Sequence, residues 1–345
     1  MTHGQRAILL TIFAMVLGVN PIAAQITLSL PTDNDALFRG KPEEFYMYTD
    51  RDFEGVKSTP WEGGQFGYVR NPHRLSTGIV FQRMHAGIDI RPVHRDPSGE
   101  PLDIVRSIAP GQVVYVSDVP SHSNYGRYLI VEHIWDGCAY YSLYAHLNAA
   151  SVEAGQKVDA GTPLGRLGYT GAGINKTRAH LHLEINMMLN PKFGEYYSSD
   201  APASPNLHGA YNGQNLVPLD VTRILQESRK GTLVSIPSFV ASEEPFYSVL
   251  LPNKGTPEMV RRYPWLLRGA SLEGTPSMEI IFNRWGLPIQ VKPGTRAVEA
   301  PTIASVRRSN IPYAYLTGGR ITGVGEEAVI TPRGLRYLQL ITYPN

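Results

Sequence analysis

The feature that most constrains the fold is a pair of strand-like runs on either side of Asp136-Gly137. Residues 128–135 and 138–146 are rich in β-branched and aromatic residues, a composition typical of strands. Asp-Gly is a preferred two-residue turn between antiparallel strands, because its backbone accepts the positive φ angles that a tight hairpin needs. The sequence therefore predicts an antiparallel β-hairpin in the middle of the chain.

The second of these runs carries a histidine, and successive side chains of a strand point to opposite faces. We expect the apolar face to pack on the core and the more polar face to carry His146. The two predicted faces are Ser142, Tyr144 and His146 on one side, and Leu143, Ala145 and Leu147 on the other.

Short runs of the same kind, rich in Val, Tyr and Gly, continue from about residue 61 to about residue 190 and predict an all-β domain. Residues 25–60 carry no clear signal and form an N-terminal segment. Residues 191–217 hold Pro, Ser, Asn and Gly without periodicity, which predicts a long loop or linker. Residues 218–345 give mixed signals and predict a smaller C-terminal α+β region of unknown role.

In this C-terminal region, residues 221–229, 258–267 and 332–341 have helical spacing, and residues 278–291 resemble a hairpin around Trp285-Gly286. The region contains no histidine, so it offers no imidazole to a metal. We expect it to be dispensable for any chemistry, so that a chain ending near residue 217 folds, and to affect substrate choice or location.

Composition limits the class of protein. The chain has 345 residues, of which 42% are hydrophobic and 18% charged, so a sizeable buried core is expected. The formal net charge of +2 does not indicate a nucleic-acid partner. Cys138 is the single cysteine, which excludes an intramolecular disulfide and a cysteine-based metal site. The sequence carries no signal for an oligomeric state.

The first 24 residues have the layout of a secretory signal peptide. Arg6 precedes an apolar stretch over residues 7–19, and the small pair Ala23-Ala24 follows. The alternative is an uncleaved membrane anchor, but the apolar stretch is shorter than the roughly 20 residues that span a bilayer. We therefore expect an exported protein of the periplasm or cell-wall space that is not an integral membrane protein after cleavage.

Two segments, about ninety residues apart, place imidazole and carboxylate groups on one strand face. Residues 84–90 read Met-His-Ala-Gly-Ile-Asp-Ile, so His85 and Asp89 point the same way on either side of Gly87. Residues 179–185 read Ala-His-Leu-His-Leu-Glu-Ile, so His180, His182 and Glu184 share a face. Either pattern alone is typical of a polar surface on an edge strand. Facing each other, the two strands can supply three ligands to zinc and leave a fourth position open for water.

The sequence here resembles the lysostaphin-type (LytM-like) zinc endopeptidases, which act on peptidoglycan. The family's His-x-Gly-x-Asp, Tyr-x-His-Leu and His-Leu-His-x-Glu-Ile segments stand in the family's order at residues 85–89, 144–147 and 180–185. Residues 152–161 and 165–171 match its glycine turns, and residues 66–70 resemble its opening strand. The resemblance implies a compact, mainly antiparallel β metallopeptidase domain over residues 61–190.

The resemblance also implies roles for single residues. One zinc ion would be bound by His85, Asp89 and His182, while His146 and His180 would hydrogen-bond the reacting water and the developing oxyanion. Zinc-activated water would attack a peptide carbonyl of the peptidoglycan peptides. Glu184 would be either a partner of a ligand or a solvated strand residue.

The chain departs from the family where Arg178-Ala179 replaces the usual Gly-Pro before His180. Substrate preference therefore cannot be carried over from the family. Lys176 and Arg178 in this loop would either contact a substrate carboxylate or be solvated. Five other histidines are expected to lie outside the metal site: His73, His94, His122, His133 and His208.

A different class of function has the same fold. Some relatives have lost the metal site and act as cell-wall binding or regulatory proteins that activate other wall hydrolases. Such relatives lack one or more ligands, whereas all the family's histidine and aspartate positions are filled here. The sequence therefore favours an active zinc metalloendopeptidase.

Overall fold

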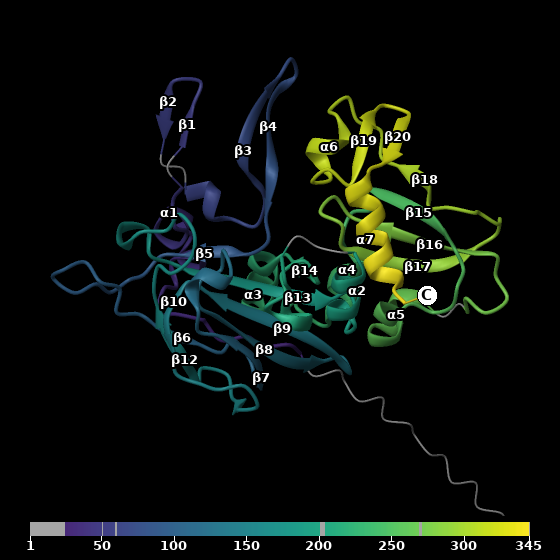
Figure 1. Ribbon diagram of the computed structural model, residues 1–345. Helices are drawn as coiled ribbons and strands as arrows, with labels where there is room; N and C mark the ends of the chain where they lie inside the picture. Colours follow the sequence, from purple (N-terminus) through teal and green to yellow (C-terminus); the bar gives the residue numbers. More distant parts are fainter. Residues whose placement is uncertain (1–24, 50, 59–60, 201–203, 269–270, 345) are drawn as a thin grey trace, which may run out of the picture.

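The computed structural model describes residues 25–49, 51–58, 61–200, 204–268 and 271–344. The expected signal peptide over residues 1–24 lies outside these residues. The fold is mainly β, and all its named strand pairs are antiparallel, which confirms the predicted fold class (Figure 1). In the described part of the chain, no helix combines the length and the apolar character that crossing a membrane requires.

One seven-stranded sheet carries the residues of interest. Its main path runs in the order β11-β7-β8-β9-β13-β14. Both β5 and β14 pair with the same edge of β13, β5 with its first residues and β14 with its last. The strands are β5 (Ile88–Ile90), β7 (Gly111–Ser117), β8 (Tyr128–Trp135), β9 (Cys138–Ala145), β11 (Lys157–Val158), β13 (Leu181–Met188) and β14 (Leu216–Leu219).

The predicted hairpin is confirmed as β8 and β9. The turn residues Asp136 and Gly137 have φ angles of 51° and 73°, the left-handed conformation that a two-residue turn of this kind requires. Trp135 pairs with Cys138 across the turn. The local turn chemistry therefore fixes the register of the two central strands.

The predicted alternation holds within β9, where Leu143 and Ala145 lie on one face and Tyr144 on the other, but both faces are buried and His146 and Leu147 do not follow the predicted alternation. Ala145 is the cross-strand partner of His182, and Tyr144 that of Leu183, so Tyr144 points to the core face and Ala145 to the face of His182. His146 follows the strand with a φ of 62°, which interrupts the alternation. This left-handed residue, and not strand periodicity, brings the His146 ring to the site.

Both faces of the sheet are covered. The larger core lies on the face of Leu181, Leu183 and Ile185, and a second cluster that includes Leu143 and Ala145 lies on the other face. A three-stranded sheet in the order β10-β12-β6 packs its apolar residues into the larger core. Its strands are β6 (Ile104–Arg106), β10 (Leu147–Ala150) and β12 (Pro163–Leu167), and the 3-10 turns nearby are η3 (Pro120–His122) and η4 (Lys176–Arg178).

The N-terminal segment, for which the sequence gives no signal, packs beside β5. Tyr46 forms an isolated antiparallel bridge with Ile90, and the Met47 amide donates to the Asp89 carbonyl at 2.7 Å. The segment thereby fixes the strand that carries Asp89. Its elements are η1 (Ala36–Arg39), α1 (Pro42–Phe45), β1 (Arg51–Phe53), β2 (Val56–Ser58) and η2 (Trp61–Gly64).

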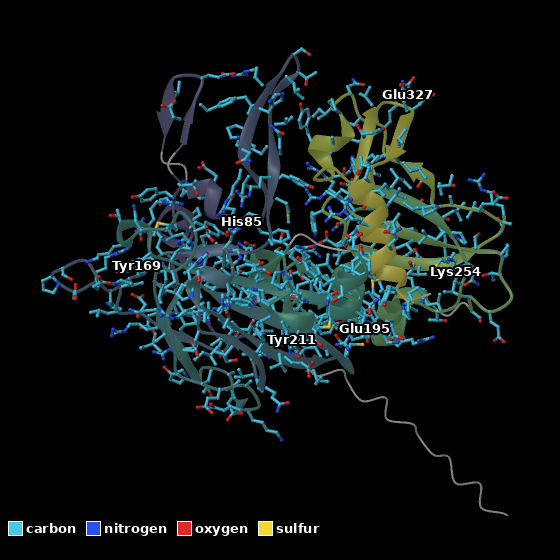
Figure 2. The ribbon with its side chains drawn as sticks, viewed as in Figure 1. His85, Tyr169, Glu195, Tyr211, Lys254 and Glu327 are labelled. Carbon is cyan, nitrogen blue, oxygen red and sulfur yellow. The ribbon has the colours of Figure 1, made fainter. Side chains whose placement is uncertain are left out.

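A long hairpin of β3 (Gly67–Leu75) and β4 (Gly78–His85) projects from the sheet and ends at His85 (Figures 1 and 2). Residues 191–217, predicted as a loop, contain α2 (Phe193–Ser199), η5 (Gly209–Tyr211) and the start of β14. Paired hydrogen bonds between Asn190 and Asn215 hold the two ends of this segment together. These long-range contacts give the segment an order that its composition does not indicate.

The C-terminal region is α+β, as predicted, with a four-stranded sheet in the order β17-β16-β15-β18. The expected hairpin and the helices near residues 221–229 and 332–341 are present. The expected helix over residues 258–267 is split before Pro264, since a proline disfavours the helical conformation of the residue before it. The elements are α3 (Val221–Lys230), α4 (Ile236–Ala241), β15 (Tyr247–Pro252), α5 (Glu258–Arg262), η6 (Pro264–Leu267), β16 (Ser277–Phe282), β17 (Pro288–Gly294), β18 (Thr302–Val306), α6 (Tyr313–Leu316), β19 (Ile321–Val324), β20 (Glu327–Ile330) and α7 (Pro332–Thr342).

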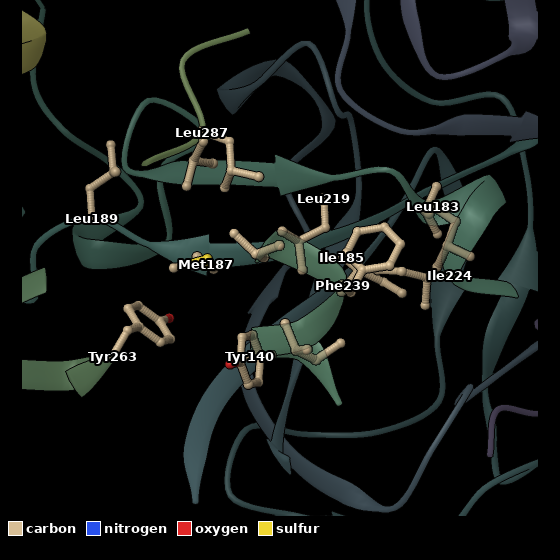
Figure 3. Packing of buried hydrophobic residues seen from close by; sticks show 14 of the residues in the cluster. Tyr140, Leu183, Ile185, Met187, Leu189, Leu219, Ile224, Phe239, Tyr263 and Leu287 are labelled. Carbon is tan, nitrogen blue, oxygen red and sulfur yellow. The ribbon is translucent and has the colours of Figure 1, made fainter. Parts of the chain in front are cut away.

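The C-terminal region shares a core with the central sheet. Figure 3 shows Phe239, Tyr263 and Leu287 gathered around Ile185 and Met187 of β13. The Tyr263 hydroxyl also donates to the Ala139 carbonyl at 2.8 Å and accepts from the Met188 amide at 2.9 Å. The division of the chain into domains at residues 190 and 218 stays a prediction, but the packing between its two sides is continuous.

Candidate metal centre

Strand pairing places two of the expected ligands side by side. Asp89 of β5 is the cross-strand partner of His182 of β13. His85 ends β4, and two residues, Ala86 and Gly87, separate it from the start of β5. A side chain at Gly87 would place its Cβ 2.2 Å from the Leu183 carbonyl oxygen. Glycine is therefore required there if the His85 and Asp89 backbone is to lie against β13.

The three expected ligands converge. Asp89 Oδ1 lies 2.9 Å from His182 Nδ1 and 3.1 Å from His85 Nε2, and the two imidazole nitrogens are 3.1 Å apart. In the described part of the chain, these residues are the one group of histidine, cysteine and acidic side chains arranged to hold a metal. Tetrahedral zinc ligands at 2.0–2.1 Å from the ion are about 3.3 Å apart, so the triangle has the size and donor types that suit zinc.

The ring orientations of the two histidines are set by their outer nitrogens. His85 donates from Nδ1 to the Gln65 carbonyl at 2.7 Å, which leaves Nε2 facing Asp89. His182 has the opposite arrangement, since its Nε2 lies 2.8 Å from Glu184 Oε1 and its Nδ1 faces Asp89. Such outer partners fix the tautomer and the direction of a histidine ligand.

Glu184 is a partner of a ligand and not a solvated strand residue. Only 1% of its surface is exposed. Besides its contact with His182, it accepts hydrogen bonds from the Tyr125 hydroxyl at 2.8 Å and from Asn186 Nδ2 at 2.9 Å. Three donors therefore hold one buried carboxylate against the His182 ring.

Arg70 is a site residue that the sequence did not single out. Its guanidinium contacts Asp89 Oδ2, lies 3.1 Å from His85 Nε2, and donates to the Gly63 carbonyl at 2.9 Å. Asp89 is thus held from both sides, by His182 at Oδ1 and by Arg70 at Oδ2. The one sequence signal that pointed to Arg70 was the resemblance of residues 66–70 to the family's opening strand, and this resemblance assigned no role to the arginine.

His146 and His180 lie beside the triangle. His146 directs Nδ1 to the Thr170 carbonyl at 2.8 Å, and His180 directs Nδ1 to the Arg178 carbonyl at 2.7 Å. Their ring centroids are 4.8 Å apart, and His180 Nε2 is 3.4 Å from Asp89 Oδ1. Gly171 has a φ of 108° and passes so close to the His146 ring that a Cβ there would lie 3.1 Å from Nδ1. Because the Nδ1 atom of each ring contacts a backbone carbonyl, the Nε2 atoms of His146 and His180 are the ones left to face the site.

Burial controls the charge of most of these histidines. It lowers the pKa of His85 to about 4, and it also lowers the pKa values of His146 and His180. Burial would raise the pKa of Asp89, but neighbouring His180, His85 and Arg70 outweigh it and hold that pKa well below its usual range. His85, His146 and His180 are therefore neutral near pH 7, and Asp89 is ionised.

His182 behaves differently from the other three. Burial would lower its pKa, but the hydrogen bonds to Asp89 and Glu184 outweigh burial and raise the pKa to about 9. A histidine must present an unprotonated nitrogen to bind a metal. A metal and a proton therefore compete for His182 Nδ1.

The loop before His180 does not supply a free lysine. Lys176 Nζ lies 2.7 Å from Glu100 Oε1, so an acidic side chain of the chain itself pairs with its charge. Among the other histidines, His133 and His208 are buried and have protein partners of their own. In the residues that the structure describes, none of the five histidines expected outside the site joins the metal-holding group.

Residues 83–192 match the model of peptidase family M23. This match confirms the resemblance of that part of the chain to the lysostaphin-type peptidases. The C-terminal region from residue 218 lies outside the match. A comparison with curated proteins finds no match.

Several solved structures are similar. One is the catalytic domain of the antimicrobial peptidase lysostaphin from Staphylococcus simulans, at 21% identity over 47% of this chain and 90% of that chain, with a TM-score of 0.29. A zinc-containing peptidase from Vibrio cholerae is 25% identical over 41% of this chain and 36% of that chain, with a TM-score of 0.26. A chain of the SpoIIIAH and SpoIIQ complex is 22% identical over 46% of this chain and 91% of that chain, with a TM-score of 0.27.

Proposed function

We propose that this protein is an exported zinc metalloendopeptidase that hydrolyses peptide bonds of peptidoglycan in the periplasm or cell-wall space. The observation that carries the proposal is the convergence of ligand atoms from His85, Asp89 and His182 within a segment that matches a peptidase family. The choice of peptidoglycan follows from the resemblance of residues 85–89, 144–147 and 180–185 to the lysostaphin-type motifs.

The three ligands fit one zinc ion. When bound, zinc would supply Lewis-acid chemistry and lower the pKa of a water molecule to near neutrality. The protein's part is to hold the ligands rigidly: Gln65 and Glu184 orient the two imidazoles, and Arg70 orients Asp89. Three neutral or anionic donors on strands leave a fourth position for the reacting groups.

His146 and His180 are proposed to handle the proton and the developing negative charge. Both rings are neutral and buried, and both direct Nε2 away from a backbone carbonyl that holds Nδ1. A neutral imidazole with a free Nε2 accepts a proton from a nucleophilic water and returns it to the leaving amine. When protonated, the same nitrogen donates a hydrogen bond to an oxyanion.

The proposal is tested on purified, full-length mature protein. We expect about one equivalent of zinc per chain, the stoichiometry of a single three-ligand site. Digestion of purified peptidoglycan, with mass analysis of the fragments, should release products of peptide-bond cleavage and identify the bond. A metal-free protein that cleaves peptidoglycan equally well would overturn the mechanism.

The digestion of purified peptidoglycan also tests the alternative that the protein regulates other wall hydrolases. A regulator would leave purified peptidoglycan intact and increase cleavage by another wall hydrolase. The matched control is His85→Ala, which removes one ligand from the triangle. If the native protein cleaves nothing, and if both it and His85→Ala stimulate another wall hydrolase, the protein is a regulator of that hydrolase and not a peptidase.

A further inference from the structure

Three arginines gather around Tyr68, at the junction of the β3–β4 hairpin and the C-terminal region. The Arg284 guanidinium lies 5.2 Å from the centre of the Tyr68 ring. A Cβ on Gly318 would lie 3.3 Å from the Tyr68 hydroxyl and 3.7 Å from Arg320 Nη1, and a Cβ on Gly319 would lie 4.0 Å from Arg333 Cδ, so Arg320 and Arg333 lie on the same side of the hairpin as Tyr68. Burial raises the pKa of Tyr68, and the charges of the three arginines act in the opposite direction. We call Arg284, Arg320 and Arg333 the Tyr68 arginine cluster.

The positive charge of this cluster is not neutralised by the protein. In the described part of the chain, no carboxylate forms an ion pair with any of its three guanidinium groups, whereas Arg74, Arg223 and Arg307 each pair with a glutamate. Burial, Arg320 and Arg336 lower the pKa of Arg333, as expected for like charges held together. Arg284 Nε is buried without a hydrogen-bond partner. An anion placed among these groups would relieve their repulsion and satisfy free donors.

The cluster is held in place by the fold and is not a chance gathering of flexible side chains. Arg320 lies over the Tyr337 ring, with Cζ 4.5 Å from its centre, and donates to the Thr317 carbonyl at 3.0 Å. Gly286 permits this approach, because a Cβ there would lie 2.8 Å from Arg320 Cζ. The Tyr337 hydroxyl in turn donates to the Gly286 carbonyl at 2.7 Å. The position of Arg320 is therefore determined by contacts among several C-terminal elements.

The hairpin connects this cluster to the metal centre. Tyr68 lies two residues before Arg70, which contacts Asp89. The β3–β4 pairing shifts register between these two residues, so Tyr68 and Arg70 are separated by at most the roughly 7 Å that two residues of regular strand span. The hairpin also contacts the C-terminal region, since the ring centres of His73 in β3 and Tyr315 in α6 are 5.0 Å apart. A substrate held at the metal centre can therefore extend toward the cluster.

We propose that Tyr68, Arg284, Arg320 and Arg333 form a subsite for an oxyanion, and that it receives a carboxylate of the substrate near the scissile bond. Carboxylate recognition by several guanidinium donors is strong and geometrically specific. The inference rests on the proposed function and assigns substrate selection to the C-terminal region.

The test compares two forms of one probe with the zinc-loaded, full-length protein. The probe is a peptide dimer isolated from peptidoglycan, either with its carboxylates free or with all of them amidated. Since a hydrogen bond to a charged group contributes about 1.5–3 kcal/mol, we expect the free acid to bind about tenfold or more tightly than the amide. Arg333→Gln, at an exposed position, should reduce this preference severalfold, mainly through KM and not through kcat.

The matched control is Arg308→Gln, which removes the same charge from an exposed arginine paired with Glu326 at 3.7 Å. It should keep the full preference for the acid. Calorimetry measures the affinity for both probes even if no bond is cleaved. It therefore tests the oxyanion subsite separately from the proposed peptidase activity. Equal affinity for acid and amide would overturn the subsite and leave the peptidase proposal standing. Competition by millimolar inorganic phosphate without any acid-over-amide preference would assign the cluster to phosphate and overturn the carboxylate assignment.

Discussion

Asp89 Oδ1 lies 2.9 Å from His182 Nδ1 because the two residues are cross-strand partners in the β5–β13 pair. They are 93 residues apart in sequence, yet the hydrogen bonds of the strand pair set their separation. Ligands on paired strands are more precisely placed than ligands on loops. Strand pairing in the sheet therefore positions two of the three expected ligands, and the β4 end of the hairpin supplies the third, His85.

Asp89→Ala and His146→Ala should both abolish peptidase activity, but with different zinc contents. Loss of Asp89 leaves two imidazoles for the metal, so zinc should be lost on purification. Loss of His146 leaves the triangle complete, so zinc should stay near one equivalent while the rate falls by about 10²–10⁴-fold. Metal analysis and turnover on each purified variant measure both effects. Zinc loss in His146→Ala with retention in Asp89→Ala would reverse the roles assigned here.

Glu184→Ala should weaken zinc binding without removing a ligand. The carboxylate holds His182 Nε2 at 2.8 Å, and loss of such an outer partner typically costs about 10–100-fold in metal affinity. Competition with a chromophoric chelator gives the affinity. Tyr125→Phe is the matched control, since it removes one of the hydrogen bonds to Glu184 and leaves the carboxylate on His182. Wild-type affinity in Glu184→Ala would show that Glu184 does not orient the ligand.

His133 should make stability depend on pH at a distance from the metal centre. It is fully buried, stacks on Trp135 and contacts Pro110 and Ser142, and burial lowers its pKa to about 4. Because the folded pKa lies below the unfolded value near 6.5, the unfolded chain binds the proton more readily. The stabilisation is complete above about pH 6.5 and is lost as the pH falls toward 4, by about 2 kcal/mol between pH 7 and pH 5.

Urea unfolding of the wild type and of His133→Gln at several pH values isolates this contribution. The glutamine cannot titrate, so the difference in unfolding free energy between the two proteins should shrink as the pH falls. A difference that stays constant from pH 7 to pH 5 would contradict the assignment.

A chain that ends after residue 217 should not fold stably, contrary to the expectation from the sequence. The truncation cuts β14 after two of its four residues and removes Phe239, Tyr263 and Leu287 from the core around Met187. Each large apolar side chain that loses its burial costs about 1.5–3 kcal/mol, and whole proteins are stable by only about 5–15 kcal/mol. Circular dichroism during heating should show no cooperative transition near that of the full chain. A truncated protein with wild-type thermal unfolding would restore the original expectation.

The sequence by itself determined the local features. Turn chemistry at Asp136-Gly137 fixed the central hairpin. The spacing of histidines and acidic residues on strand faces marked the two segments that meet at the site, and the resemblance to the family selected the three ligands that converge. Helical spacing identified α3 and α7. These predictions succeeded because strand alternation, helix periodicity and tight turns depend on neighbouring residues.

Tertiary structure decided how distant segments meet. The left-handed backbone at His146 reversed the face expected from alternation, and nothing in the spacing of residues 142–147 encodes that change. Arg70, Gln65 and Tyr125 reach the site or its supporting carboxylate from segments brought together only by strand pairing and hairpin folding. The C-terminal region packs on the core of the sheet for the same reason. Burial of apolar surface stabilises contacts between residues that are remote in sequence, and such contacts leave no periodic pattern in the sequence.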